Sequence, residues 1–374
     1  MDRIVIVGHS IAGITCGDTL RRLGFDGELT YVGEEDVPAY PRPSLSKAAL
    51  APGDGIDIAP LPQAAEGVEL LGRTAVSLDP SARTVLLDDG TSLPYDGLVI
   101  ATGSRARRLT DSGREYTLRS LADARRLRAR LVEKPRLTVI GGGPLGMEVA
   151  SGAIGLGCEV TLLNPGIPLS QHLGPLLGGT LAALAEKAGV RIIDTLVESV
   201  AETGTGMAVT LPDGEVIESD AVFTGIGDDP EVSWLRDSGL LVDGRLIVDS
   251  RQRLSPHPGI VAAGDVCWLD GPGGPRRSPI WHSAIAQARV AADGLLHGDA
   301  AAERDHPTYF WTDQWGISLK VSGTPPRDDV EPVVVRGSLE EGAFVLHWPE
   351  QRAAAALGMR MPIPRLHRLA AGTA

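Results

Sequence analysis

The chain opens with a strand, a glycine turn, a helix and a second strand, an order that few folds share. Residues 4–7 are an apolar run of the length of a buried parallel strand, and a helix is predicted over residues 14–23. Gly8 and Gly13 bracket the turn, and Glu34 follows the second strand, about 20 residues beyond the turn. Unpaired N–H groups at the start of such a helix bind a pyrophosphate, and the carboxylate accepts a hydrogen bond from a ribose hydroxyl. The segment therefore predicts half of a dinucleotide-binding fold.

A second copy of this arrangement begins at residues 137–140. That apolar run is followed by three glycines, a predicted helix and a strand at residues 159–163. Residues 74–87 and 196–211 alternate like the strands of a meander next to Asp-Gly turns. They lead into two similar segments, LVIATG at 98–103 and AVFTGIG at 221–227. Two dinucleotide sites in one chain predict electron transfer between two nucleotides. The expected fold class is α/β, with two Rossmann-like dinucleotide-binding domains, one nested in the other, and a small C-terminal α+β domain.

The chain has the length of two or three domains of about 150 residues each. The first domain is expected to be discontinuous, over residues 1–105 and 229–305, because a nested domain leaves the sheet of its host unfinished. The second domain is expected over residues 106–228. The tail, residues 306–374, contains alternating strands, one of them predicted at residues 330–335, and a final basic helix.

Composition and charge exclude several classes of protein. The formal net charge of −13 disfavours nucleic acid as a partner. No apolar run approaches the roughly 20 residues of a membrane span, and no leader precedes the first strand, so we expect a cytoplasmic protein with no membrane partner. The three cysteines, Cys16, Cys158 and Cys267, form no C-x-x-C pair. Their spacing excludes a redox-active dithiol and offers no metal or iron–sulfur site, so their expected role is packing.

Positive charge gathers between Arg105 and Arg136, where arginines outnumber acids. Apolar residues such as Leu127 and Leu131 give this segment one buried face and leave most arginines outward. Two interpretations stay open. The arginines form either an ordinary solvated helix face or a docking patch for an acidic protein.

Five motifs occur in order along almost the whole chain: GFDGELTYVGEEDVPAYPRPSLSKAAL, LVIATGSRARRL, GGGPLGMEVA, GIVAAGD and FWTDQWG. Together they resemble the FAD-dependent ferredoxin reductases that are similar to putidaredoxin reductase and rubredoxin reductase. The resemblance implies FAD in the first module and a nicotinamide nucleotide in the second, with NADH preferred and NADPH possible. It also implies a C-terminal domain that helps to wall the flavin.

The resemblance assigns site residues position by position. The FAD contacts that it implies are Gly8, Ser10, Ala12, Gly13, Glu34, Arg42, Lys47, Val76, Ala101, Thr102, Gly103, Arg119, Asp265 and Trp281. The contacts of the nicotinamide nucleotide that it implies are Gly141, Gly143, Gly146, Glu148, Asn164 and Gly227. The catalytic residues that it implies are Lys47, Glu148 and Trp311, and it implies no metal.

Some of these roles also have a physical rationale. Reduced flavin carries negative charge near N1, which the N–H groups of a helix starting after Trp281 would stabilise. Lys47, beside the isoalloxazine, would favour the anionic form and position the nicotinamide. Outside this motif, Lys47 would be read as a solvated residue, and Trp311 and Trp315 as packing in the core or cap.

Four positions depart from the family pattern. Ser10 replaces the middle glycine of the first turn, where its hydroxyl can donate to the pyrophosphate. In the second module, Pro144 replaces an aromatic residue, Asn164 an acid, and Pro279 a glutamate that precedes the return helix. Asn164 neither repels a 2′-phosphate nor chelates a ribose diol strongly, and only His172 follows it in place of an arginine cluster.

The expected function is transfer of hydride from NAD(P)H to FAD and of single electrons from FAD to a small iron–sulfur ferredoxin that supplies an oxygenase. One alternative is a flavoenzyme with another acceptor, such as oxygen, nitrite or a biosynthetic substrate. The absence of cysteine from residues 42–47 argues against the thiol-assisted peroxidase and oxidase branch. The other alternative is a flavin-bound interaction protein resembling apoptosis-inducing factor, in which nucleotide binding switches assembly.

Overall fold

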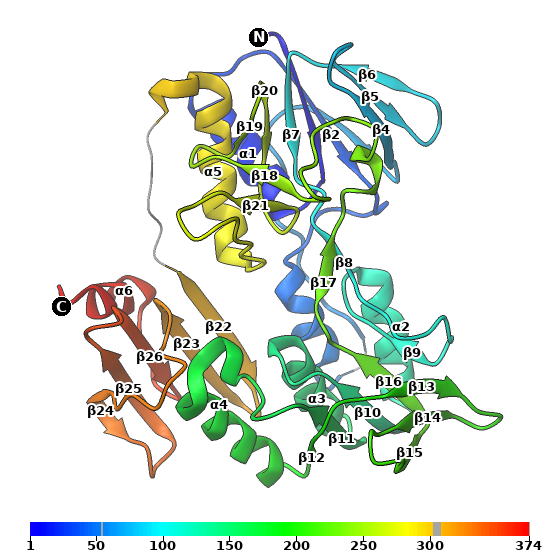
Figure 1. Ribbon diagram of the computed structural model, residues 1–374, viewed down its shortest axis with the longest axis vertical. Helices are drawn as coiled ribbons and strands as arrows, with labels where there is room; N and C mark the ends of the chain where they lie inside the picture. Colours follow the sequence, from blue (N-terminus) through cyan, green and yellow to red (C-terminus); the bar gives the residue numbers. More distant parts are fainter. Residues whose placement is uncertain (54, 302–307, 374) are drawn as a thin grey trace. The chain divides into compact units, whose positions relative to one another are not determined.

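The computed structural model describes residues 1–53, 55–301 and 308–373. The chain divides into two compact units, drawn together in Figure 1. Unit 1 takes in Met1–Arg42, Ala59–Arg105 and Asp228–His306, and unit 2 takes in Pro43–Ile58, Ala106–Gly227 and Pro307–Ala374. The boundaries expected for three separate domains stay a prediction.

Unit 1 is built on a six-stranded sheet in the order β19-β20-β7-β1-β2-β3 (Figure 1). Its strands are β1 (Arg3–Val7), β2 (Glu28–Gly33), β3 (Val68–Leu71), β7 (Gly97–Ile100), β19 (Arg253–Leu254) and β20 (His257–Ala262). All neighbours pair in parallel except β19 and β20. The first glycine turn thus follows the central strand of the sheet.

Alternation along β1 explains how this sheet is buried on both faces. Ile4 and Ile6 pack against α1 (Ile11–Arg22) and α5 (Trp281–His297), which also pack against each other. Val5 and Val7 face a second core. That core includes residues of the three-stranded meander β4 (Ala75–Asp79), β5 (Thr84–Leu87) and β6 (Ser92–Pro94), of η3 (Ser233–Leu235), and of the pair β18 (Leu246–Val248) and β21 (Cys267–Leu269).

Unit 2 repeats the plan with a five-stranded parallel sheet in the order β12-β11-β10-β16-β9. Its strands are β9 (Glu115–Tyr116), β10 (Arg136–Ile140), β11 (Glu159–Asn164), β12 (Arg191–Asp194) and β16 (Ala221–Thr224). The helices of this part are α2 (Leu121–Leu131), α3 (Pro144–Gly155) and α4 (Ser170–Lys187). A meander of β13 (Ser199–Glu202), β14 (Met207–Thr210) and β15 (Val216–Ser219) packs on the sheet, so both predicted meanders are confirmed. Two short strands, β8 (Ser104–Ala106) and β17 (Asp228–Pro230), pair with each other.

The tail of unit 2 is an antiparallel sheet in the order β22-β23-β26-β25-β24 with one helix. Its elements are β22 (Tyr309–Gln314), β23 (Ile317–Ser322), β24 (Val333–Ser338), β25 (Ala343–Trp348), β26 (Ala353–Leu357) and α6 (Ile363–Ala371). Leu366 and Ala370 bury one face of α6 against this sheet. The strand predicted at residues 330–335 starts only at Val333, since the preceding Pro332 has no N–H to donate to a ladder.

One arginine of α2 is an exception to the outward placement that was expected for most arginines of this segment. Arg128 is buried, and its guanidinium donates to the carbonyl oxygens of Ala49 (3.0 Å), Ala51 (2.7 Å) and Gly53. The sequence pattern missed this role because the acceptors are backbone atoms of a distant segment. Arg128 fixes α2 to the segment that contains η2 (Ala48–Leu50).

Candidate functional site

The first glycine turn, in unit 1, brings three backbone segments closer together than any side chain would allow. Gly8 has a φ of +121°, and a Cβ there would lie 2.1 Å from the carbonyl oxygen of Ala101. A Cβ on Gly13 would lie 2.0 Å from the carbonyl oxygen of Gly8. Glycine is therefore required at both positions for β1, α1 and the end of β7 to meet.

This turn leaves hydrogen-bond donors at the start of α1. Ser10 is the N-cap, but its side chain makes no capping bond. The N–H groups of the first helical residues, Ile11 to Gly13, have no acceptor four residues earlier within the helix. The loop at Gly264 lies alongside, because a Cβ on Gly264 would lie 3.3 Å from that of Ala12, and it brings Asp265 next in sequence. Donors without partners around a glycine turn fit the pyrophosphate of a dinucleotide.

The acids after β2 have different environments. Glu34 is 60% exposed, and Arg105 holds it at 3.2 Å. Glu35 instead accepts hydrogen bonds from Arg42 at 2.8 Å and from the hydroxyl of Tyr40 at 2.7 Å. Glu34 is thus the carboxylate that stays accessible to a ribose, whereas Arg42 binds the neighbouring Glu35.

The other residues of unit 1 assigned by the resemblance are more dispersed. Ala101 and Thr102 follow β7 directly, and the Thr102 hydroxyl donates to the carbonyl oxygen of Glu231 at 2.7 Å. Gly103, next in sequence, has a positive φ of 71°. Trp281 is the first residue of α5. Val76 is exposed on β4, which belongs to the separate three-stranded sheet.

The second glycine turn, in unit 2, has the same close approach. A Cβ on Gly141, where φ is +100°, would lie 2.4 Å from the carbonyl oxygen of Gly225, and one on Gly146 would lie 1.9 Å from that of Gly141. Gly143 is the N-cap of α3, and Pro144 is its first residue. Proline suits that position because its fixed φ is helical and no acceptor is needed for a missing N–H. Pro144 therefore favours the start of α3. The turn fits a second pyrophosphate.

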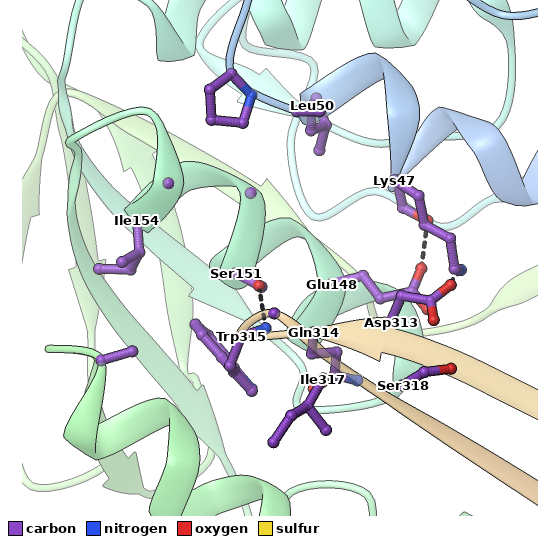
Figure 2. Close-up of a pocket in the computed structure, with 17 residues that line it drawn as sticks. Lys47, Leu50, Glu148, Ser151, Ile154, Asp313, Gln314, Trp315, Ile317 and Ser318 are labelled. Carbon is purple, nitrogen blue, oxygen red and sulfur yellow. Dashed lines mark hydrogen bonds and ion pairs between the residues drawn. The ribbon is translucent and has the colours of Figure 1, made fainter. Parts of the chain in front are cut away.

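A buried carboxylate in unit 2, that of Glu148, contacts side chains of two other segments, and Figure 2 shows it beside Lys47. Glu148 of α3 is 6% exposed, and its Oε1 lies 2.7 Å from Nζ of Lys47, which precedes η2. The same oxygen accepts from the hydroxyl of Thr312 on β22 at 2.6 Å, and Oε2 accepts from the hydroxyl of Ser46. Gln314 extends the network by donating to the Thr312 hydroxyl at 2.8 Å.

Trp311 adds an aromatic face to this cluster. Nζ of Lys47 lies 5.6 Å from the centre of its ring, within the range of a cation–π contact, and the ring stacks on Tyr309. The structure thus brings together the three residues predicted as catalytic, Lys47, Glu148 and Trp311. Ser46 and Thr312 were missed, although both belong to motifs noted in the sequence.

A cavity of about 620 Å³ opens beside the cluster and is lined in part by Lys47, Glu148, Ser151 and Trp315 (Figure 2). Trp315 occupies the turn between β22 and β23 with a positive φ of 54°, and its backbone N–H donates to the hydroxyl of Ser151 at 2.8 Å. This bond fixes the hairpin to α3.

Three further assigned residues lie in unit 2. Arg119 precedes α2, and its backbone N–H donates to Asp123 at 3.0 Å. Gly227, with a φ of +97°, follows β16. Asn164 ends β11, and its side chain bonds to the backbone of the glycine turn and of the next loop.

Comparison with known proteins identifies the family. Residues 2–291 match the family described as pyridine nucleotide-disulphide oxidoreductase. The chain belongs to this family. A relative from Burkholderia cepacia, named as the ferredoxin–NAD(+) reductase component of an anthranilate 1,2-dioxygenase system, is 36% identical over 92% of this chain and 87% of its own. Another, from Photorhabdus laumondii, is named as the ferredoxin–NAD(+) reductase component of 3-phenylpropionate/cinnamic acid dioxygenase. It is 33% identical over 99% and 96%.

Solved structures agree with this placement. The oxidoreductase is similar to the reductase in a covalent complex of putidaredoxin reductase with putidaredoxin, with 30% identity, a TM-score of 0.84, and coverage of 98% of this chain and 92% of the other. The predicted fold class and the resemblance are thereby confirmed. The protein is a flavin- and NAD-dependent oxidoreductase of the ferredoxin reductase type.

The oxidoreductase does not carry the thiol chemistry that the family description mentions. Its three cysteines are free and buried, and burial raises the pKa of Cys16 and of Cys267 to about 12 and that of Cys158 to about 11. Such thiols are neither paired nor ionised at neutral pH. Among residues 1–53, 55–301 and 308–373, no group of acids, histidines and cysteines is arranged to hold a metal ion. Over the same ranges, every helix is too short or too polar to span a membrane.

Proposed function

We propose that this oxidoreductase takes hydride from NADH and passes single electrons, by way of FAD, to a small iron–sulfur ferredoxin that supplies an oxygenase. The observation that carries the proposal is the pair of glycine turns, each with backbone approaches that exclude a Cβ. The relatives named as ferredoxin–NAD(+) reductase components of dioxygenase systems support this acceptor.

Each group of residues has a proposed role. Bound FAD supplies the conversion of an electron pair into two single-electron transfers. The turn at Gly8 and Gly13 binds its pyrophosphate, and Glu34 accepts from its adenosine ribose. The turn at Gly141 binds the pyrophosphate of the nicotinamide nucleotide. Lys47, whose ammonium is oriented by Glu148, supplies positive charge to the reduced flavin.

Anaerobic addition of NADH to the purified flavoprotein is expected to bleach the flavin absorbance rapidly, and stopped-flow spectroscopy measures the rate. NADPH is expected to bleach it more slowly. Addition of an oxidised [2Fe–2S] ferredoxin should then restore the flavin absorbance while the iron–sulfur absorbance falls. Dithionite, which reduces flavin without a nucleotide site, is the control for a competent flavin.

The outcomes separate the alternatives. If dithionite bleaches the flavin and neither nucleotide does, the proposed hydride transfer is wrong and a nucleotide-switched assembly protein gains support. If NADH bleaches the flavin but no ferredoxin reoxidises it, the acceptor is a different one, such as oxygen or nitrite.

We further propose that the ferredoxin docks on the region between Arg105 and Arg136. Much of its charge is already compensated, since Arg114 lies 3.4 Å from Glu202 and Arg136 lies 3.1 Å from Asp220. Arg125 on α2 is exposed and has no ion pair among the residues that the structure describes. The proposed docking therefore depends on few cations. We expect the affinity for the ferredoxin to fall only modestly as the salt concentration rises.

An Arg125→Gln variant is expected to raise the KM for an acidic ferredoxin about two- to fivefold at low salt with kcat unchanged, because a rim charge acts mainly on encounter. The difference should vanish at high ionic strength, where the Debye length falls to about 3 Å. Arg289→Gln on α5, also exposed and outside this region, is the matched control. Equal KM values for Arg125→Gln and the wild type would exclude docking through this cation.

A further inference from the structure

The ends of the neighbouring strands β11 and β12 in unit 2 bear on the coenzyme preference, an inference that rests on the proposed function. Asn164 stands where an acid would bind the ribose hydroxyls of a dinucleotide. Its carboxamide is already engaged. Oδ1 accepts from the N–H of Gly142 at 2.8 Å, and Nδ2 donates to the carbonyl oxygens of Pro165 at 3.1 Å and Gly166 at 3.0 Å. Because an amide has two N–H donors, Asn164 has none left to offer to a 2′-phosphate.

A carboxylate lies on the neighbouring strand. Asp194 is the last residue of β12 and pairs in parallel register with Asn164. Its Oδ1 accepts from the N–H of Gly166 at 2.7 Å, in the same turn that Asn164 holds. Asp194 is exposed, and within the described part of the chain its second oxygen has no hydrogen bond or ion pair. A carboxylate oxygen with no partner among the described residues therefore lies at the carboxyl ends of the parallel strands, the side of the sheet where a dinucleotide binds.

The loop after β11 offers no compensating cation. Residues 164–174 contain neither lysine nor arginine. His172 lies at the glycine turn, with Cε1 3.9 Å from where a Cβ would stand on Gly143. Burial, with the nearby charge of Arg327, lowers the pKa of His172 below its ordinary value, so the ring is neutral at neutral pH. The loop itself thus lacks the arginine that accommodates a 2′-phosphate in NADPH-dependent folds, and the cation near His172, Arg327, belongs to the C-terminal part of unit 2.

We propose that Asp194, and not Asn164, sets the preference of this reductase for NADH over NADPH. The free oxygen of Asp194 accepts from the ribose diol of NADH, whereas the 2′-phosphate of NADPH brings a further one to two negative charges against it. Like charges a few ångströms apart at a protein surface change a binding constant by roughly tenfold to a hundredfold. The acid that is missing from the end of β11 is thus supplied by the neighbouring strand, β12.

The test measures equilibrium binding, not turnover. Dissociation constants of NAD⁺ and NADP⁺ are determined by isothermal titration calorimetry on the flavin-loaded protein at one pH and ionic strength. The wild type is expected to bind NAD⁺ at least about tenfold more tightly than NADP⁺. Asp194→Asn keeps an acceptor for Gly166 but removes the charge, so it should tighten NADP⁺ about tenfold and change NAD⁺ little.

Asp213→Asn is the matched control, because the Oδ1 of Asp213 likewise accepts from a backbone N–H, that of Glu215 at 3.0 Å, in the turn between β14 and β15. It should leave the ratio of the two dissociation constants unchanged. Asp194→Ser, which also removes the charge, repeats the measurement should Asp194→Asn fold poorly. Equal affinities in the wild type, or an unchanged ratio in both Asp194 variants, would overturn this inference alone. Binding of neither nucleotide would overturn the proposed function together with it.

Discussion

A Gly8→Ala variant is expected to be isolated without flavin. At a φ of +121°, a Cβ on residue 8 would lie 2.1 Å from the carbonyl oxygen of Ala101 and 2.4 Å from its carbonyl carbon. These atoms belong to the backbone, and the N–H of Ala101 is itself bound to the carbonyl oxygen of Val7 at 2.7 Å, so no side chain can move aside. The backbone conformation alone costs about 1–3 kcal/mol for a residue with a side chain. The clash must therefore displace the turn that binds the pyrophosphate, and the visible flavin absorbance per protein measures the loss.

Two further glycine variants serve as comparisons. Gly141→Ala carries the equivalent clash in unit 2, at 2.4 Å from the carbonyl oxygen of Gly225, so it should retain flavin but lose reduction by NADH. Gly24→Ala has a φ of +93° with no atom within 4 Å of the new Cβ. It should lose only about 1 kcal/mol of stability and keep both properties. A Gly8→Ala protein with a full complement of flavin would show that this turn does not bind FAD.

A Glu148→Ala variant is expected to lose about 3 kcal/mol of unfolding free energy, at the lower end of the range for breaking a buried ion pair. The substitution leaves the ammonium of Lys47, 18% exposed, without its carboxylate, and it also leaves the hydroxyls of Ser46 and Thr312 without their acceptor. Denaturant unfolding of the flavin-loaded protein, followed by circular dichroism, measures the change.

The double variant Lys47→Met with Glu148→Gln is expected to recover part of this loss, because no unpaired charge is left in the cluster. Glu215→Ala is the control. Its partner Arg191 is 4.0 Å away and both side chains are more than half exposed, so the loss should stay below about 0.5 kcal/mol. Equal losses for Glu148→Ala and Glu215→Ala would mean that the buried cluster contributes nothing beyond a surface pair.

The Lys47–Glu148 pair also bears on the reaction. With the role that the resemblance gives to Lys47, Lys47→Met should slow the bleaching of the flavin by NADH by roughly a hundredfold, the usual effect of removing one stabilising charge or donor. The affinity for NAD⁺ should change much less. An unchanged rate of bleaching would leave Lys47 a structural residue of unit 2.

Both dinucleotide-binding modules could be predicted from the amino-acid sequence alone. A strand that must be buried, a helix that must begin at a particular residue and a glycine that must take a positive φ are local requirements, so the spacing of Gly8, Gly13, Gly141 and Gly146 is enough to predict them. The alternation of residues in the two meanders is equally local, and the structure confirms both. The prediction for residues 330–335 was wrong at its start, because Pro332 has no N–H to donate and the strand begins at Val333.

Which side chains contact one another depends on tertiary packing and could not be predicted from the sequence. Glu148 contacts Ser46 and Thr312, which lie 102 and 164 residues away in the chain, and no periodicity records such a contact. Most arginines between Arg105 and Arg136 were expected to point outward, yet the guanidinium of Arg128 is buried against backbone carbonyls of a distant segment. Asp194 gained a neighbour in Asn164 only through the pairing of β11 with β12. Local backbone geometry depends on adjacent residues, whereas the environment of a charge depends on packing between segments that are far apart in sequence.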